Sequence, residues 1–296
     1  MPDGLRREEL FLSCIAIRSP VGPAVPLVVA VPHAGSRLSW DMPETVRRDQ
    51  AALRALQDPW TDQLVVGAQE RGAWTLLTAW SRAVADVNRA PNELDPSVLG
   101  PEAADGAWLA TVKARAGLGV VPTRVGGREL YPRRLTVRDV HQRVALAHRP
   151  YHDALAQLLA MLTARFGFVV LLDLHSMPES AQAGPGAVDV ALGDRYGRTA
   201  DARWVGIIEA ELQAAGLVVG RNRPYAGGYV AEAYGRPKHG VHVVQVEFRR
   251  GLYMDEARFT AHAGLQHLRS VCDRLFERLA GALRDDLTAG LPIAGE

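Results

Sequence analysis

The sequence has few cysteines, no block of like charge and no long apolar run. Its 296 residues include only two cysteines, Cys14 and Cys272, far apart in apolar or helical surroundings. This argues against a disulfide scaffold and a thiolate zinc site, and we expect a reducing, cytoplasmic location. With 34 Lys and Arg against 33 Asp and Glu, the formal net charge is +1. This balance predicts no nucleic-acid or membrane-surface partner.

Signals for export and several well-known catalytic motifs are also missing. The segment MPDGLRREELFLSC carries charges where a signal peptide needs an apolar stretch. No apolar run approaches the length of about 20 residues that crosses a bilayer, so we expect neither secretion nor anchoring. The patterns GxSxG, GxxxxGK before Ser or Thr, HExxH, and GxGxxG after a strand do not occur. Their absence argues against the usual serine hydrolases, P-loop proteins, zincins and dinucleotide-binding proteins.

The order of predicted elements indicates an α/β protein with a mixed central sheet. Apolar segments typical of buried strands lie at 27–31, 168–176 and 241–249. Other strands are expected at 188–193 and at 73–80 with 83–87, the last two as a strand pair or one interrupted strand. Helices are expected at 47–57, 59–70, 136–166 with a break at Pro150, 200–216 and 255–286, and irregular segments at 92–106 and 222–240. No long linker occurs, which predicts one domain over 1–296.

Two histidines follow the strongest predicted strands at their carboxyl ends. His33 comes after 27–31 and His175 ends 168–176, so one sheet could bring them together. Imidazole is a good zinc ligand, and a catalytic zinc takes about three protein ligands. Asp58 or Asp62, at the start of an expected helix, could supply the third. The alternatives are a structural role for each histidine and a helix N-cap for each aspartate.

Two carboxylates in apolar strands are candidates for roles beside the metal. Asp173 precedes His175 by two positions and would face the same side of the strand, where it could orient that imidazole. Its alternative is a solvent-facing strand end. Glu247 lies in an apolar strand, where a carboxylate is costly to bury unless it is paired or useful, so it is a candidate general base or acid. Its alternative is an ion pair with Arg249 or Arg250.

Two other segments carry candidate substrate-binding residues. Arg82, Asn88 and Arg89 lie at the end of an apolar stretch, and arginine binds a carboxylate through two parallel hydrogen bonds. Their alternative is structural pairing with aspartate. The loop residues Tyr225, Gly227 and Gly228 include paired glycines that let the backbone approach a ligand or turn sharply.

Three side chains surround Pro150 in the expected helix 136–166. They are His148, Tyr151 and His152. We expect them to be packing and capping groups at a helix start, with a pair of metal ligands as the alternative.

Five segments together resemble the N-formylglutamate amidohydrolase family. They are PHAG at 32–35, SRAVADVNR at 81–89, DLHSMP at 173–178, NRPYAGGY at 222–229 and QVEFRRGLYMDE at 245–256. The resemblance extends from about Leu27 to Glu256. It implies the zinc-exopeptidase-like (phosphorylase/hydrolase-like) three-layer α/β fold with a mixed central sheet, shared with carboxypeptidases and aspartoacylases.

The resemblance also implies a metal site with two histidines and one carboxylate. His33 and His175 match the histidine positions. In the aspartoacylase relatives the carboxylate belongs to an HxxE motif, whose last position is Ser36 here. We therefore take Asp58 as the third ligand, with Asp62 as the next choice. One Zn²⁺ ion is the expected metal, with another divalent metal as the alternative.

The implied reaction is hydrolysis of N-formyl-L-glutamate to formate and L-glutamate, late in histidine breakdown. Glu247 matches the catalytic glutamate and would help a zinc-activated water attack the formyl carbon. Asn88 and Arg89 resemble a DLNR motif that binds a substrate carboxylate, and Arg82 is expected beside them. Alternatives are a related zinc hydrolase of another N-acyl amino acid or peptide end, and a metal-free binding protein on the same fold. The expected partner is a small molecule, and the sequence leaves open a homo-oligomer.

Overall fold

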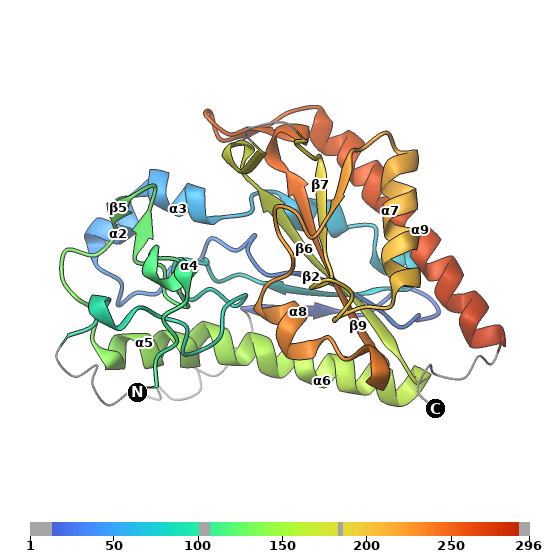
Figure 1. The fold of residues 1–296 in the computed structure, drawn as a ribbon, viewed down its shortest axis with the longest axis horizontal. Helices are drawn as coiled ribbons and strands as arrows, with labels where there is room; N and C mark the ends of the chain where they lie inside the picture. The colour runs from blue at the N-terminus through green and yellow to red at the C-terminus, as the bar shows by residue number, and fades with distance from the viewer. Residues whose placement is uncertain (1–13, 101–106, 183–185, 290–296) are drawn as a thin grey trace, which may run out of the picture. The chain divides into compact units, whose positions relative to one another are not determined.

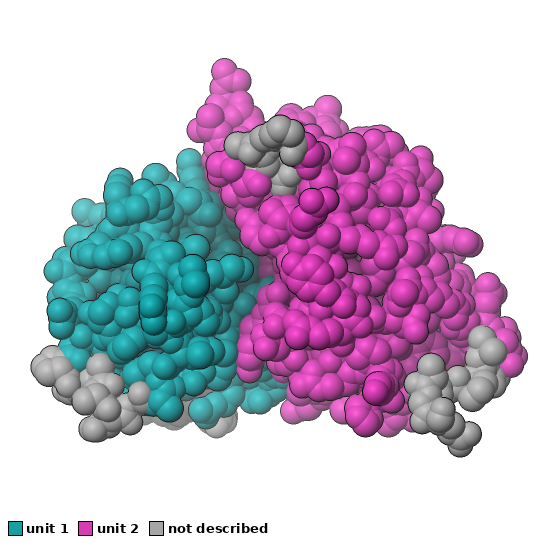
Figure 2. All heavy atoms as spheres, in the orientation of Figure 1, with its two compact units in different colours: residues 1–16, 32–57, 78–154 teal, residues 17–31, 58–77, 155–296 magenta. Residues whose placement is uncertain are grey.

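The computed structural model describes residues 14–100, 107–182 and 186–289. The chain forms two compact units, coloured separately in Figure 2. One comprises residues 1–16, 32–57 and 78–154, and the other comprises residues 17–31, 58–77 and 155–296. One domain over 1–296 stays a prediction. The N-terminal stretch to residue 13 and part of the expected irregular segment 92–106 lie outside the described residues.

The main sheet has seven strands in the order β1-β3-β2-β6-β9-β7-β8. Strands β3, β2, β6 and β9 pair in parallel, β7 pairs antiparallel to β9, and β8 pairs parallel to β7. The predicted α/β class with a mixed central sheet is therefore confirmed. The strand bounds are β1 Ile15–Arg18, β2 Leu27–Val31, β3 Trp74–Thr78, β6 Val169–Met177, β7 Val190–Gly193, β8 Val219–Arg221 and β9 Val241–Arg249.

Burial explains why the central strands appear in the sequence as continuous apolar runs. Every residue of β2 and of β6 is buried, as expected for parallel strands covered on both faces. Figure 1 shows helices on both sides of this sheet, with α7 and α9 on one side and α6 on the other. The larger helices are α6 Arg149–Phe166, α7 Ala202–Ala214 and α9 Gly264–Ala289. No helix of the described residues is long and apolar enough to cross a membrane.

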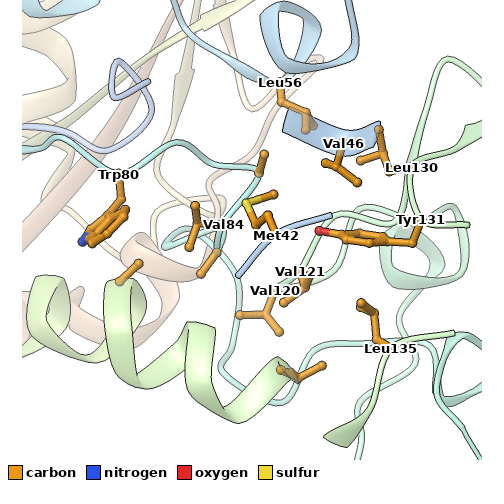
Figure 3. Packing of buried hydrophobic residues seen from close by; sticks show 14 of the residues in the cluster. Met42, Val46, Leu56, Trp80, Val84, Val120, Val121, Leu130, Tyr131 and Leu135 are labelled. Atoms are coloured by element: carbon orange, nitrogen blue, oxygen red, sulfur yellow. The ribbon is translucent and has the colours of Figure 1, made fainter. Parts of the chain in front are cut away.

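The other unit has a core of its own, built mainly from loops and short helices. Figure 3 shows this cluster of buried side chains, among them Met42, Trp80, Val121 and Tyr131. The guanidinium of Arg143 is buried here and donates to the hydroxyl of Tyr131. The short elements around the cluster are α2 Glu44–Arg48, α3 Gln50–Leu56, η3 Pro96–Val98, α4 Val112–Arg115, β4 Arg124–Val125, β5 Arg128–Glu129 and α5 Val137–Arg143.

The helix expected at 59–70 is wrong. Two 3-10 segments occupy this stretch instead, η1 (Thr61–Val65) and η2 (Gln69–Arg71). Trp60, in a left-handed conformation with φ of 59°, precedes η1 and makes no side-chain cap. The expected N-cap role of Asp58 is therefore wrong too, because its carboxylate bonds to distant side chains.

Three other expected elements differ in the structure. Residues 83–87 form turns rather than a strand. The expected loop 222–240 contains a short helix and a 3-10 turn, α8 (Tyr229–Tyr234) and η7 (Pro237–His239). The last helix starts at Gly264, after η8 (Arg250–Leu252) and the small strands β10 (Met254–Asp255) and β11 (Thr260–Ala261). The remaining short helix is η6 (Glu179–Gln182).

Pro150 does not break the helix in which it lies. Instead a π-helical turn, η5 (Val144–His148), joins α5 to α6. Proline cannot donate to the carbonyl one α-turn earlier, and a π turn changes the hydrogen-bond spacing at that point. Thr136 forms the predicted cap, in a capping box with Asp139.

Candidate active site

The parallel pairing of the central strands brings the predicted residues to one edge of the sheet. On β6 and β9, His175 is opposite Glu247, and Asp173 is opposite Gln245. Asp173 is also the register partner of Ala30 on β2, three residues before His33. Carboxyl ends of parallel strands are where α/β sheets place ligands.

His33, Asp58 and His175 form a buried group that could hold a metal ion. One ligand atom from each residue can be chosen so that all three atoms lie within 4.8 Å of one another. Two imidazoles and one carboxylate are a donor set that catalytic zinc uses. The residues present therefore fit a metal. Asp62, the other candidate for the third ligand, is exposed in the first turn of η1 and is not in this group.

The ring of each histidine is oriented by a second carboxylate. His33 donates from Nε2 to Asp86 Oδ1 at 2.8 Å, and His175 donates from Nε2 to Asp173 Oδ2 at 3.0 Å. This is the usual arrangement behind metal-binding imidazoles, and it leaves Nδ1 of each ring as the metal-facing nitrogen. His175 Nδ1 lies 3.1 Å from Asp58 Oδ2. Two tetrahedral zinc ligands at normal bond lengths are about 3.4 Å apart, so this spacing suits a shared metal.

Neighbouring charges shift the pKa values of His175 and Asp86 strongly. Burial alone lowers the pKa of His175, but Asp173, Asp58 and Glu247 together raise it well above its usual value. Burial alone raises the pKa of Asp86, yet Arg82, His33 and Arg89 bring it well below its usual value. The negative potential around His175 favours a cation at this position.

Asp58 has different neighbours at its two oxygens. Ser176 Oγ donates to Oδ1 at 3.3 Å, and Arg250 approaches the same oxygen at 3.4 Å. Arg250 also pairs with Glu256 at 3.2 Å. Oδ2 is therefore the oxygen presented to His175. The pairing of Arg250 with Asp58 has no sequence signal, because the two residues are 192 positions apart.

Glu247 is buried in β9, and its neighbour Gln245 donates from Nε2 to its Oε1 at 2.7 Å. The arginines considered for the alternative ion pair have other carboxylate partners. Arg249 instead pairs with Glu179 and Asp189, and Arg250 pairs as described above. Gln245 was missed, although a polar residue two positions before Glu247 in an apolar strand was a usable signal.

The three predicted carboxylate-binding residues surround Asp86. Arg82 Nε donates to Asp86 Oδ2 at 2.7 Å, and Arg89 Nε lies 3.6 Å from the same oxygen. The backbone N–H of Asn88 donates to Asp86 Oδ1 at 2.9 Å. The alternative role of these arginines, structural pairing with an aspartate, is therefore observed. Each guanidinium has five N–H donors, so pairing with Asp86 leaves donors that a ligand could use.

His148 and His152 hydrogen-bond to the backbone of the segment that carries Asn88 and Arg89. His148 Nε2 donates to the carbonyl of Arg89, and His152 Nε2 donates to the carbonyl of Val87, each at 2.8 Å. Their rings are 4.2 Å apart. They do not belong to the His33 metal group, and their role is to fix the backbone that carries Asn88 and Arg89.

The predicted loop residues lie just before α8. Tyr225, Gly227 and Gly228 are half-buried, and Gly227 has φ of 113°, a conformation that favours glycine. The N–H of Gly228 donates to Gln245 Oε1 at 2.6 Å. The loop is therefore linked to the strand that carries Glu247.

A family model described as N-formylglutamate amidohydrolase matches residues 25–254. The chain belongs to this family. Among curated relatives, the N-formylglutamate deformylase of Pseudomonas aeruginosa is 33% identical over 267 residues, covering 86% of this chain and 92% of the relative. The N-formylglutamate deformylase of Pseudomonas putida is 30% identical, covering 78% of this chain and 83% of the relative.

Solved structures agree with this membership. The N-formylglutamate amidohydrolase of Ralstonia eutropha is similar at a TM-score of 0.85 and 32% identity, over 92% of this chain and 99% of that one. A gene product of Agrobacterium tumefaciens shares the fold at a TM-score of 0.63 and 17% identity, over 92% of this chain and 96% of that one. The N-formylglutamate amidohydrolase match spans every predicted site residue from His33 to Glu247 and ends before α9.

Proposed function

We propose that this family member hydrolyses N-formyl-L-glutamate to formate and L-glutamate, as a step of histidine degradation. The observation that carries the proposal is the buried group His33, Asp58 and His175 with Glu247 as the register partner of His175. The curated relatives are named for the same reaction.

The proposed metal is Zn²⁺, held by His33 Nδ1, Asp58 Oδ2 and His175 Nδ1. When bound, it supplies a Lewis acid that polarises the formyl carbonyl and lowers the pKa of water. Asp86 and Asp173 keep the two imidazoles oriented through Nε2. Arg250 and Ser176 keep Oδ1 of Asp58 turned away from His175.

Glu247 acts as the proton carrier. It accepts a proton from the attacking water as the new C–O bond forms at the formyl carbon. It then gives that proton to the nitrogen as the C–N bond breaks, so that formate and the free amine of glutamate leave. Arg89 and Asn88, with Arg82 beside them, bind the carboxylates of the glutamate part, and the loop of Tyr225, Gly227 and Gly228 contacts the substrate.

The proposed setting is the cytoplasm, with a small-molecule substrate as the partner and no nucleic-acid or membrane partner. Supporting this, Cys14 and Cys272 are both buried and neither is in a disulfide. A homo-oligomer is left open.

Formate release from N-formyl-L-glutamate tests the proposal. The purified protein is assayed as prepared, after chelation, and after readdition of Zn²⁺, with Glu247→Gln as the matched variant. Zinc-dependent release that falls by about a thousandfold or more in Glu247→Gln supports the proposal. A metal-loaded protein that releases only other acyl groups from a panel of N-acyl amino acids assigns a different substrate. No turnover of the whole panel overturns the hydrolase function.

A further inference from the structure

Gln245 is a buried amide in the middle of the predicted catalytic strand. Only 4% of its surface is exposed, and it lies on β9 beside Asp173 of β6 and Gly193 of β7. Burying an amide is unfavourable unless its donor and acceptor are both used. Gln245 uses both. Its Oε1 accepts from the N–H of Gly228 at 2.6 Å, and its Nε2 donates to Glu247 Oε1 at 2.7 Å.

These two contacts fix the orientation of the amide. A backbone N–H can only donate, so the atom that faces Gly228 must be the oxygen. The amide nitrogen then points to Glu247, whose ionised carboxylate can only accept.

The backbone around Gly228 is held close to the sheet. A Cβ atom at Gly193 would lie 2.5 Å from the nitrogen of Gly227, so this approach requires glycine at position 193. The backbone N–H of Arg195 donates to the carbonyl of Ala226 at 2.7 Å. The N–H of Gly228 is therefore presented to Gln245 by a loop with its own anchors, and Gln245 does not have to order that loop itself.

We propose that Gln245 is a positioning residue that connects the Gly228 loop to Glu247 and decides which carboxylate oxygen carries the proton. A proton on Oε1 would face the N–H of Gln245 and lose the 2.7 Å hydrogen bond. The proton taken from water therefore resides on Oε2, and Oε1 stays an acceptor throughout the cycle. The same amide places Glu247 relative to the loop that contacts substrate. This inference rests on the proposed function of Glu247.

Gln245→Met tests the inference, because methionine has a similar length and volume but neither the donor nor the acceptor. Gln213→Met, at an exposed glutamine of α7, is the matched control. We expect kcat to fall about tenfold to a hundredfold in Gln245→Met with KM within about twofold, because misplacing a catalytic group by about 1 Å has effects of this size. Gln213→Met should match the parent protein. Bound metal and melting temperature are measured for every variant.

A double-mutant cycle separates positioning from a general packing defect. In a Glu247→Gln background, the loss caused by Gln245→Met should shrink to less than about twofold, because the two residues act through one proton transfer. Unchanged kcat in Gln245→Met, or an equal fold-loss in both backgrounds, overturns the inference while the proposed function stands. Should Glu247→Gln be inactive, the kcat and KM of the single variant decide. A parent protein without turnover of any N-acyl amino acid overturns the proposed function and the role of Gln245 with it.

Discussion

At the residue scale, the two oxygens of Asp58, the proposed third metal ligand, have different neighbours. Oδ1 faces Ser176 and Arg250, and Oδ2 faces His175. Groups behind a metal ligand hold its geometry, and their loss typically weakens metal binding about tenfold to a hundredfold.

Replacing Arg250 by methionine should weaken metal binding by about that factor, because Asp58 and Glu256 both lose their guanidinium partner. Competition with a chromogenic chelator measures the dissociation constant directly. Arg249→Met is the matched control, since the neighbouring Arg249 pairs with Glu179 and Asp189 instead. Equal metal affinities in the two variants would contradict the role given to Arg250.

Replacing Arg89 by lysine keeps the charge but removes the planar fork that binds a carboxylate at two points. We expect KM for N-formyl-L-glutamate to rise about tenfold, or about 1.4 kcal/mol, with a smaller change in kcat. Steady-state kinetics measure this. The metal content should stay normal, because the hydrogen bond between His33 and Asp86 is retained. A change confined to kcat would instead show that Arg89 acts on the reacting atoms.

Some of these residues could be read from the sequence and others could not. His33, His175 and Glu247 were identifiable because polar side chains at the ends of apolar strands have few structural reasons to be there. Asp58 and Asp62 could not be separated, because both lie at one expected helix start and only the fold shows which is buried. Asp86 lies 53 positions from His33, so its role behind that ring depended on tertiary contacts.

At the element scale, His148 and His152 are four residues apart where η5 meets α6, so their rings lie side by side. Both hydrogen-bond to the backbone of the segment that carries Asn88 and Arg89. Burial, with a smaller contribution from the nearby His148, lowers the pKa of His152 to about 3. Burial also lowers the pKa of His148. Asp86 acts in the opposite direction on His148, and the ring of Tyr151 faces His152 edge-on.

This pair predicts an acid-sensitive part of the stability. The pKa of histidine in the unfolded chain is about 6.5, so the unfolded state takes up the proton first as pH falls. The stability that depends on neutral His152 is therefore complete above about pH 6.5 and is lost progressively toward pH 3. The slope approaches about 1.4 kcal/mol per pH unit for each such histidine.

His152→Gln keeps an N–H donor for the carbonyl of Val87 and cannot be protonated. Urea unfolding at a series of pH values between about 6.5 and 4 should show a shallower loss of stability in this variant. His267→Gln, an exposed histidine of α9, should follow the parent curve. Identical slopes for all three proteins would contradict a neutral, buried His152.

The elements that sequence predicted well are those whose local pattern and tertiary surroundings agree. The segments expected at 27–31 and 241–249 are β2 and β9 to the residue, because both strands are buried over nearly their whole length and are rich in valine. The helix expected at 59–70 failed because a left-handed Trp60 and 3-10 turns replace it, and no local pattern marks such a turn.

At the scale of the whole molecule, metal removal should lower stability, since the buried group brings two carboxylate-backed imidazoles and Asp58 together only in the folded chain. A ligand that binds only the folded state stabilises it by about 4 kcal/mol when present at a thousand times its dissociation constant. Scanning calorimetry of chelated protein should show a lower melting temperature that Zn²⁺ restores. A melting temperature that does not depend on metal, in protein shown to bind it, would contradict this.

The division into two units was not visible in the sequence because the chain alternates between them. Residues 17–31 and 58–77 of one unit are separated by residues 32–57 of the other, and none of these crossings is a long linker. A boundary is recognisable from composition only where a polar, flexible segment separates continuous domains.

The strand order has a consequence for how the protein is made. β9 lies between β6 and β7, so the sheet stays open until residue 249 has left the ribosome, although β2 was synthesised more than two hundred residues earlier. Until then β6 presents an unpaired apolar edge, the kind of edge that recruits strands from other chains. Premature stop codons between β6 and β9 should therefore give insoluble products, and chaperones should bind the nascent chain from the synthesis of β6 until that of β9.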